Sequence, residues 1–424
     1  MLHSLFRYYS GMSHTERLAK EIVTQLKEKG YTAFYAGGFV RDKLLGIPSS
    51  DIDIATDALP NEVAALFPEH FLVGAQFGVC VVRHKSHSFE VATFRQDVSY
   101  HDGRRPTEVV LRSTPEEDAK RRDFTVNGMF YDPITNEVLD FVGGQDDLQQ
   151  GVIRTIGKAQ ERFEEDRLRM IRAIRFAFRL GFSIEEATRS AIIELSHTLL
   201  PSVSMERIWQ ELQKIRQGPN FSEALLEMSH LGLLGSCLPP LKKVSTDLIK
   251  MRLEGIEKVS EKVPTILILS ELFSPEDIPF VLGLGIYLRG SKDETKWIET
   301  LLEIKGLWQQ DPDFTRHYEW AMLLANKRSK ACLELLFTKQ EDNVRNAAQK
   351  QLAACEMHLQ PHIERIHKKK PLLQAKDLQE LGITPGKRMG ELLQLAERLT
   401  IEQNLKSSEE VIQKLMQDPS WIDT

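Results

Sequence analysis

The chain has few cysteines, since Cys80, Cys237, Cys332 and Cys355 are the four among its 424 residues. They are scattered without CxxC spacing, which argues against a disulfide framework and against a zinc site. Long apolar runs are also missing. The longest stretches, such as Pro279 to Leu288, are interrupted by glycines and are much shorter than the roughly 20 residues that cross a bilayer. These absences predict a protein without a membrane span that resides in a reducing cytoplasm.

The N-terminus lacks the features of a secretory signal. Met1 to Gly11 is mildly apolar, with one arginine, no clear h-region and no small-residue cleavage site, and Met12 is an alternative start. Internal repeats, low-complexity segments and heptad arrays are missing as well, which argues against a solenoid and against a long coiled coil. Hydrophobic residues make up 42% of the chain and charged residues 27%, which is typical of a soluble globular protein.

Net positive charge is missing too, because 55 basic residues stand against 61 acidic ones and give a formal charge of -6. A protein that binds nucleic acid needs cations near the phosphates, so the distribution of charge matters more than the sum. The basic residues concentrate in a few places: Arg104 and Arg105, Arg121 and Arg122, Arg162 to Arg179, and Lys368 to Lys370. These clusters predict a basic track on an acidic body.

The pattern of apolar residues changes along the chain, whose length indicates two to four domains. Residues 15–29 have helical spacing and end at Gly30, which predicts an N-terminal helix within residues 1–29. Residues 30–145 alternate short β-branched runs with helical segments such as Pro60 to Phe67, which predicts an α/β unit with a mixed sheet. The predicted strands are Tyr31 to Ala36, Ser50 to Ala55, Gly78 to Arg83, His87 to Phe94 and Thr107 to Leu111.

The rest of the chain is predicted to be helical. Val142-Gly143-Gly144 indicates a hinge, and from Gln160 onward amphipathic segments are broken by glycines and prolines. We divide this part into residues 146–217, 218–369 and 370–424. The fold class is therefore α+β, with a mixed sheet first and helices after it.

Asp51 and Asp53 are the most informative residues of the predicted sheet. Residues two apart on a strand point to the same face, so the two carboxylates project together. Their repulsion is relieved by divalent cations, and Mg²⁺ usually takes one or two carboxylates plus substrate phosphates. Gly37 and Gly38 lie upstream at a strand-to-helix turn, where backbone N–H groups can approach a triphosphate. The alternative is that the acids are solvated turn residues, but the combination favours a metal site.

Glu90 is the candidate for a third acid. It alternates with apolar residues in the segment Ser88 to Arg95, so it is expected on a strand, on the same face as the aspartates. A strand residue that faces solvent is an equally good interpretation.

Residues 121–127 place two arginines and an acid beside an apolar segment. Arginines such as Arg122 suit phosphate oxygens, and Asp123 can accept hydrogen bonds from a ribose. We include Asn127 of the same segment among the nucleotide-binding candidates. Surface salt bridging is the alternative.

Asp166 and Arg169 precede and enter a helical pattern, and their i, i+3 spacing makes them neighbours on one surface. From spacing alone, an ordinary ion pair is the simpler interpretation. However, cytosine and adenine each present an exocyclic amine donor next to a ring-nitrogen acceptor, and uracil and guanine reverse that order. An Asp acceptor beside an Arg donor would therefore take CTP and ATP and reject UTP and GTP. Arg172, Arg175 and Arg179 continue a basic stripe that either reaches RNA phosphates or is simply solvated.

Together these segments resemble the class II tRNA nucleotidyltransferase and bacterial poly(A) polymerase family, among the polymerase-β-type nucleotidyltransferases. The resemblance covers roughly residues 30–217, in the order of the family, and a weaker one extends from Asp377 to Gly390. Its motifs are GGFVRDKLLG, DIDIAT, FEVATFR, the loop Asp102-Gly103-Arg104-Arg105-Pro106, RRDFTVNGM, DFVGGQDDLQQGVIRTIG, EDRLR and MERIWQELQKI.

The resemblance implies a catalytic head (30–145), a base-recognising neck (146–217), a body (218–369) and an RNA-binding tail (370–424). It implies that Asp51 and Asp53 bind catalytic Mg²⁺ and that Arg41 and the Gly37-Gly38 turn hold the triphosphate. By the same resemblance Arg122 and Asp123 recognise ribose, Asp166 and Arg169 template the base, and Glu206 and Arg207 begin a helix that supports the neck. We also expect the lysines Lys368, Lys369 and Lys370 to contact RNA.

Three activities of this family remain open, namely addition of CCA to tRNA, addition of A alone, and addition of poly(A). The segment Val73 to Val79 is more similar to CCA-adding members, and a loop at Tyr100 to Pro106 argues against an enzyme that adds only the two cytidines. The sole His-Asp doublet, His101-Asp102, lies in this loop, so we expect no hydrolase activity. We favour CCA addition, with CTP, ATP and tRNA as partners, no membrane and no obligate protein partner. A catalytically silent RNA-binding protein is the alternative from another class.

Overall fold

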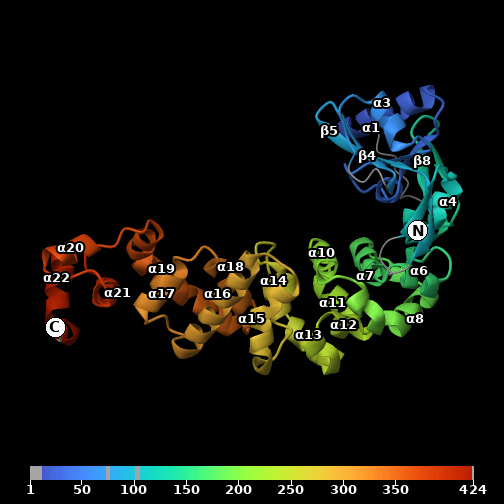
Figure 1. Ribbon diagram of the computed structural model, residues 1–424. Helices are drawn as coiled ribbons and strands as arrows, with labels where there is room; N and C mark the ends of the chain where they lie inside the picture. Colours follow the sequence, from blue (N-terminus) through green and yellow to red (C-terminus); the bar gives the residue numbers. More distant parts are fainter. Residues whose placement is uncertain (1–11, 73–76, 101–105, 423–424) are drawn as a thin grey trace. The chain divides into compact units, whose positions relative to one another are not determined.

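A computed structural model describes residues 12–72, 77–100 and 106–422. The chain divides into two compact units, residues 1–246 and 247–424, which we call unit 1 and unit 2. Unit 1 contains strands and helices, and the described part of unit 2 contains helices alone (Figure 1). The predicted α+β class, with a mixed sheet followed by helices, is confirmed. The finer division of the chain into five segments stays a prediction.

The main sheet of unit 1 has the strand order β3-β4-β5-β2-β1-β8-β9. In it β2 and β5 are parallel, and the other neighbouring pairs are antiparallel. β6 and β7 form a separate antiparallel hairpin, and β10 and β11 a short parallel pair. The strands are β1 (Ala33–Ala36), β2 (Asp53–Thr56), β3 (His70–Phe71), β4 (Val79–His84), β5 (His87–Thr93), β6 (Arg95–Tyr100), β7 (Pro106–Leu111), β8 (Phe130–Asp132), β9 (Glu137–Leu139), β10 (Val152–Ile153) and β11 (Ser183–Ile184).

Each of the five predicted strands overlaps one observed strand, namely β1, β2, β4, β5 and β7. The prediction missed β3, β6, β8, β9, β10 and β11. Strands of two or three residues, such as β8 and β9, are too short to show an alternating pattern. β2 begins at Asp53, three residues later than predicted, so Asp51 lies just before the strand.

The helices of unit 1 pack against this sheet and then against one another. α1 contacts β1 and β2, and α3 contacts β4 and β5. Figure 1 shows both helices in the sheet-containing part of unit 1. The helices of unit 1 are α1 (His14–Glu28), α2 (Gly38–Leu44), α3 (Pro60–Leu66), α4 (Pro115–Lys120), α5 (Gly144–Gln150), α6 (Ala159–Glu165), α7 (Leu168–Leu180), α8 (Glu186–Leu195), α9 (Leu199–Ser202), α10 (Met205–Arg216), α11 (Phe221–His230) and α12 (Leu233–Cys237).

The N-terminal helix forms for reasons visible in the sequence. Ser13 caps α1 by accepting a hydrogen bond from the backbone N–H of Glu16 at 3.0 Å. Leu18, Ile22 and Leu26 recur at helical spacing and are buried against the sheet. The predicted helix is therefore confirmed, with bounds that differ by one residue at each end.

Unit 2 is built from helices around apolar cores. One core, formed by residues such as Leu378, Leu392 and Leu415, holds the C-terminal helices together. Among the helices that the structure describes, none has both the length and the apolar character required to cross a bilayer. The helices are α13 (Thr246–Leu253), α14 (Thr265–Ser270), α15 (Ile278–Tyr287), α16 (Lys292–Gln310), α17 (His317–Leu324), α18 (Ser329–Thr338), α19 (Asp342–His367), α20 (Ala375–Glu380), α21 (Lys387–Glu402), α22 (Ser408–Gln417) and α23 (Pro419–Ile422).

The glycine pair predicted as a hinge forms a closely packed turn at the start of α5. Gly143 has a φ of 78°, which favours glycine, and there is open space around the position of a Cβ. A Cβ on Gly144 would lie 2.4 Å from the carbonyl oxygen of Thr125 and 2.8 Å from Cγ of Met129. Close approach to neighbouring atoms, rather than freedom to bend, therefore requires glycine at this second position.

This packing predicts that Gly144→Ala destabilises unit 1 by about 1–3 kcal/mol, because the added methyl group displaces backbone. Gly143→Asn is the matched control and should lose less stability, since asparagine tolerates a positive φ and its Cβ meets no neighbouring atom there. Hydrogen exchange of the backbone amides in residues 120–150, measured at increasing urea concentrations, would report the local loss of stability. Equal protection in the two variants would contradict the prediction.

Candidate active site

Three acids meet where β2 and β5 run side by side. Asp51 precedes β2, Asp53 is its first residue, and the side chains of Ile52 and Ile54 are buried behind them. In the parallel register Ile54 lies opposite Val91, which places Glu90 beside Asp53. Because Ile54 and Val91 are both buried, alternation directs the preceding Asp53 and Glu90 to the other face together. The structure thus brings the predicted third acid to the two aspartates.

The electrostatics of this site agree with the geometry. Burial, followed by the negative charges of Asp51 and Glu90, raises the pKa of Asp53 to about 6. The Arg122 guanidinium acts in the opposite direction. Carboxylates that share a site resist simultaneous ionisation, and a cation between them relieves the repulsion.

The donor set of the site fits a divalent cation that substrate also coordinates. Within the described residues, no group of three His, Cys, Asp or Glu side chains is arranged to hold a metal by itself. Two carboxylates such as Asp51 and Asp53 are nevertheless the usual protein contribution to an Mg²⁺ site, in which phosphates and water supply the other oxygens.

The turn between β1 and α2 brings backbone close to these acids. Gly37 has a φ of 67°, and a Cβ there would lie 3.0 Å from Nη1 of Arg122 and 3.9 Å from Oδ2 of Asp53. A side chain at this position would therefore crowd the Arg122 guanidinium and would be strained by the positive φ. Gly38 follows as the first residue of α2. The predicted Gly-Gly turn, Arg122 and Asp53 thus border the same space.

Arg41 lies behind the turn rather than at its surface. Its side chain is 1% exposed, and its Nε and Nη2 both donate to Oδ1 of Asp42, at 2.8 and 2.6 Å. Nη1 donates to Oδ1 of Asn127 at 2.6 Å. The guanidinium also lies 5.1 Å from the ring centroid of Phe176. Arg41 therefore connects α2 to residues 125–127, and its predicted contact with the triphosphate stays a prediction.

Asp123 is a buried carboxylate with several donors. Oδ1 accepts from Nδ2 of Asn127 at 3.0 Å, and Oδ2 accepts from Nε of Arg172 at 2.9 Å. Burial alone would raise its pKa, but Arg172 and the Asn127 amide hold the pKa of Asp123 well below its usual range. The carboxylate is therefore ionised at neutral pH.

The structure corrects the predicted geometry of Asp166 and Arg169. α6 ends at Glu165 and α7 begins at Leu168, and Asp166 between them has an extended conformation with φ −147° and ψ 103°. The two residues are therefore not one turn apart on a continuous helix, because the chain bends at the acid.

Each residue of this pair has other partners. Asp166 accepts from both terminal nitrogens of Arg207, at 3.3 and 2.8 Å. Arg169 donates from Nη1 to Glu165 at 2.6 Å and from Nη2 to the carbonyl of Arg121 at 3.2 Å. Both groups are thus held in defined positions by separate contacts, which argues against the simple ion pair.

The arginine stripe of α7 is paired within unit 1. Arg172 binds Asp123, Nε of Arg175 lies 2.7 Å from Oε2 of Glu211, and Nη2 of Arg179 lies 3.1 Å from Oδ2 of Asp42. Arg172 and Arg179 therefore tie α7 to the sheet-containing part of unit 1. Arg172 and Arg175 are thus ion-paired rather than simply solvated, Arg179 is paired but 45% exposed, and contact of these residues with RNA stays a prediction.

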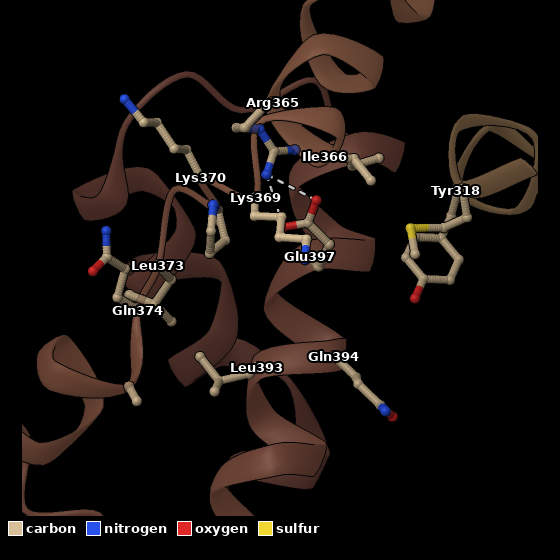
Figure 2. Close-up of a pocket in the computed structure, with 13 residues that line it drawn as sticks. Tyr318, Arg365, Ile366, Lys369, Lys370, Leu373, Gln374, Leu393, Gln394 and Glu397 are labelled. Carbon is tan, nitrogen blue, oxygen red and sulfur yellow. Dashed lines mark hydrogen bonds and ion pairs between the residues drawn. The ribbon is translucent and has the colours of Figure 1, made fainter. Parts of the chain in front are cut away.

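The predicted lysine cluster follows α19 in unit 2. Lys368, Lys369 and Lys370 are exposed, and Lys368 donates to Glu364 at 3.2 Å. Lys369 and Lys370 border a cavity of about 550 Å³ (Figure 2). Arg365 points to Glu397 there and donates to its Oε2 at 2.7 Å. The cavity is also lined by Tyr318, Met322, Ile366, Pro371, Leu373, Gln374, Ala375, Leu393 and Gln394.

Some predicted features lie outside the described residues. They are residues 1–11, residues 73–76 of the segment used to favour CCA addition, and residues 101–105 of the predicted loop, with its His101-Asp102 doublet. The four cysteines are described, and each is a buried free thiol.

Sequence reasoning missed several acids that hold the arginines of the site. Asp118 binds both Arg121 and Arg122, and Glu211 pairs with Arg175. The signal for Asp118 was available, because it lies three and four residues before the two arginines at helical spacing. Glu211 is 36 residues from its partner, and nothing in the local pattern indicates the pair.

Comparison with known proteins gives two family matches. Residues 33–154 match the poly A polymerase head domain, and residues 181–244 match the probable RNA and SrmB-binding site of polymerase A. The first match contains the acids, the glycine turn and the Arg122 segment described above.

Curated relatives include the CCA-adding enzyme of Geobacillus thermodenitrificans, 47% identical over 212 residues, which are 50% of this chain and 52% of that protein. The chain thus spans about half the length of such relatives. A longer match is to the CCA-adding enzyme of Bacillus cereus, 37% identical over 305 residues, with 68% of this chain and 75% of that protein covered.

Solved structures agree in fold. The Bacillus stearothermophilus CCA-adding enzyme in complex with CTP has a TM-score of 0.77 and 28% identity, with 96% of this chain and 98% of that chain covered. The Thermotoga maritima CCA-adding enzyme complexed with tRNA has a TM-score of 0.67, with 95% and 94% covered, and at 22% identity it supports the fold alone. With three quarters of the Bacillus cereus protein matched at 37% identity, the chain belongs to the class II tRNA nucleotidyltransferase and poly(A) polymerase family, which includes the CCA-adding enzymes.

Proposed function

We propose that this chain is an RNA nucleotidyltransferase that adds two cytidines and one adenosine to the 3′ end of tRNA from CTP and ATP, with release of pyrophosphate. The observation that carries the proposal is the meeting of Asp51, Asp53 and Glu90 beside the Gly37 turn, in a chain of this family. Its relatives in Bacillus and Geobacillus are named CCA-adding enzymes, which favours CCA over poly(A).

In this proposal Asp51 and Asp53 hold divalent cations, and Mg²⁺ is the natural choice for hard carboxylate oxygens. When bound, such ions activate an attacking 3′-hydroxyl and stabilise the leaving pyrophosphate. Glu90 adds a third negative charge within range of Asp53 and acts as a further catalytic carboxylate. The raised pKa of Asp53 supports this role, because a site that disfavours three free charges gains most from a cation.

The residues around the turn are proposed to bind the sugar and the phosphates. The Gly37-Gly38 backbone and the Arg122 guanidinium border the space next to the acids, so they are placed to meet a triphosphate. Asp123 and Asn127 would meet the ribose from the same side. Arg41 then contributes mainly by holding Asn127, and through it the ribose contact.

Asp166 and Arg169 are proposed to select the base. Glu165 and the Arg121 carbonyl fix the arginine, and Arg207 fixes the aspartate. A carboxylate acceptor and a guanidinium donor held in this way match the pairing edges of cytosine and adenine and mismatch those of uracil and guanine. Groups that are held in place cannot turn to pair with a wrong base. A wrong base therefore leaves them without hydrogen-bond partners, which increases discrimination.

The remaining assignments extend the proposal to RNA. Lys368, Lys369 and Lys370 are exposed cations suited to phosphate, and Arg179, which is 45% exposed, is the α7 arginine best placed to be shared with RNA. A cytoplasmic location follows from the tRNA substrate and stays part of the proposal.

The direct test supplies the chain with Mg²⁺, CTP, ATP and a tRNA transcript that lacks its last three nucleotides. We expect the product to gain C, C and A, and Asp53→Ala to abolish incorporation because a metal ligand is lost. Asp57→Asn is the matched control at the other end of β2 and should remain active. Long A tracts without use of CTP would indicate a poly(A) polymerase, and RNA binding without incorporation would reject the enzymatic proposal.

The pKa of Asp53 predicts how metal binding depends on pH. Since a metal must displace the proton from this carboxyl, apparent affinity should fall about tenfold per pH unit below about pH 6. Glu90→Gln removes one neighbouring negative charge and should move the onset of this fall to lower pH. Mn²⁺ binding in the presence of CTP, followed by electron paramagnetic resonance, measures both curves. An identical onset in the variant would contradict the coupling.

Arg169→Ala is expected to blur base selection more than it weakens triphosphate binding. Loss of one side of the base contact should lower the preference for CTP over UTP by about 10- to 100-fold. Arg189→Ala removes an ion-paired arginine of α8 and serves as the control. Single-turnover incorporation of CTP and UTP gives the ratio, and an unchanged ratio would refute the selecting role.

A further inference from the structure

Asp118 lies in a buried position where three segments of unit 1 meet. Its side chain, in α4, is 2% exposed. Oδ1 accepts hydrogen bonds from Nε of Arg121 at 2.8 Å and from the backbone N–H of Arg95 at 3.2 Å. Oδ2 accepts from Nε and Nη2 of Arg122 at 3.2 and 3.0 Å. One carboxylate therefore holds two consecutive arginines and the first residue of β6.

The contact of Asp118 with Arg122 affects the carboxylate site. Nη1 of Arg122 borders Gly37, and the positive charge of this guanidinium opposes the rise in the pKa of Asp53. Nη1 also donates to the carbonyl of Asn127 at 3.4 Å. Because Asp118 takes up Nε and Nη2, Nη1 is the nitrogen left to face the turn. The orientation of Arg122 thus depends on Asp118.

The contact of Asp118 with Arg121 affects Arg169, which is proposed to select the base. The carbonyl of Arg121 accepts the hydrogen bond from Nη2 of Arg169, and the side chain of Arg121 is bound to Asp118. Arg169 is therefore supported by Glu165 from its own side and, across 48 positions of sequence, by the segment that Asp118 fixes.

We propose that Asp118 is a positioning residue that couples the two sides of the site, since it sets Arg122 at the glycine turn and sets the Arg121 carbonyl against Arg169. The inference rests on the proposed function. Asp118 is buried behind these arginines and acts on a nucleotide only through them. Its contact with Arg95 extends the same support to the base of the β6–β7 hairpin.

An ionised carboxylate is required for this double role. Burial alone would raise the pKa of Asp118, but Arg122 and Arg121 hold it below its usual value. Each carboxylate oxygen then serves one arginine. An asparagine amide has one acceptor oxygen, and its NH₂ group would face a guanidinium N–H, so one arginine would lose its partner.

The test compares Asp118→Asn with Asp132→Asn. Asp132 is a buried acid at the end of β8, ion-paired with Lys27, and the β1–β8 register places it toward the start of β1, away from the Gly37 turn. In incorporation assays, Asp118→Asn should raise the KM for CTP on the order of tenfold and lower the preference for CTP over UTP. Asp132→Asn should change neither, although both variants lose an ion pair made by a buried carboxylate.

A second variant separates the effects of the contacts that Asp118 makes with Arg121 and with Arg122. Arg121→Gln leaves the contact of Asp118 with Arg122 in place, so it should lower the CTP preference while the KM for CTP stays near the wild-type value. Arg121 is 20% exposed, so this variant tests the role even if Asp118→Asn fails to fold.

The outcomes distinguish this inference from the proposed function. A wild-type chain that incorporates nothing would reject the proposed function itself. An active wild type, with base preference unchanged in Arg121→Gln and with Asp118→Asn equal to Asp132→Asn, would overturn the positioning role alone.

Discussion

Repulsion among carboxylates at the junction of β2 and β5 is the constraint on which the site depends. Parallel pairing fixes Glu90 beside Asp53, and Asp51 precedes the same strand, so the fold holds the acids together. Burial and these neighbours raise the pKa of Asp53 to about 6. Arg122 supplies nearby positive charge, and its own position is set by Asp118. The sheet thus holds charge in an arrangement that a cation and a triphosphate would stabilise.

The arginines around the carboxylate site largely form ion pairs with acids of unit 1. Arg172 binds Asp123, and Arg179 binds Asp42, so α7 is joined to the sheet-containing part by charge as well as by apolar contact. In the proposed function, this pairing allows an acidic chain to bind a phosphate substrate. The arginines next to the acids are oriented by buried carboxylates, which favours recognition of a defined ligand over general attraction to nucleic acid.

Much of this was predictable from the sequence, because the strands around the acids have a clear alternating pattern. The α+β class and the N-terminal helix follow from periodicity of 2 and 3.6 residues, and alternation indicated Glu90 as a strand residue. Its position beside Asp53 depends on the parallel pairing of β2 with β5, which local periodicity does not predict. The bend at Asp166 was not predictable, since the flanking residues have helical spacing. Nor were the partners of Arg175 and Arg179, which lie 36 and 137 positions away. Local patterns indicate elements and faces, whereas ion pairs between elements depend on tertiary packing.

The central claim is that Asp51 and Asp53 jointly hold a divalent cation beside the Gly37 turn. A crystal soaked with Mn²⁺ and CTP, measured at the manganese absorption edge, tests it directly. The account predicts an anomalous peak within coordinating distance of both carboxylates and of phosphate oxygens next to the turn. A peak bound elsewhere, or CTP bound with its phosphates away from these acids, would contradict it.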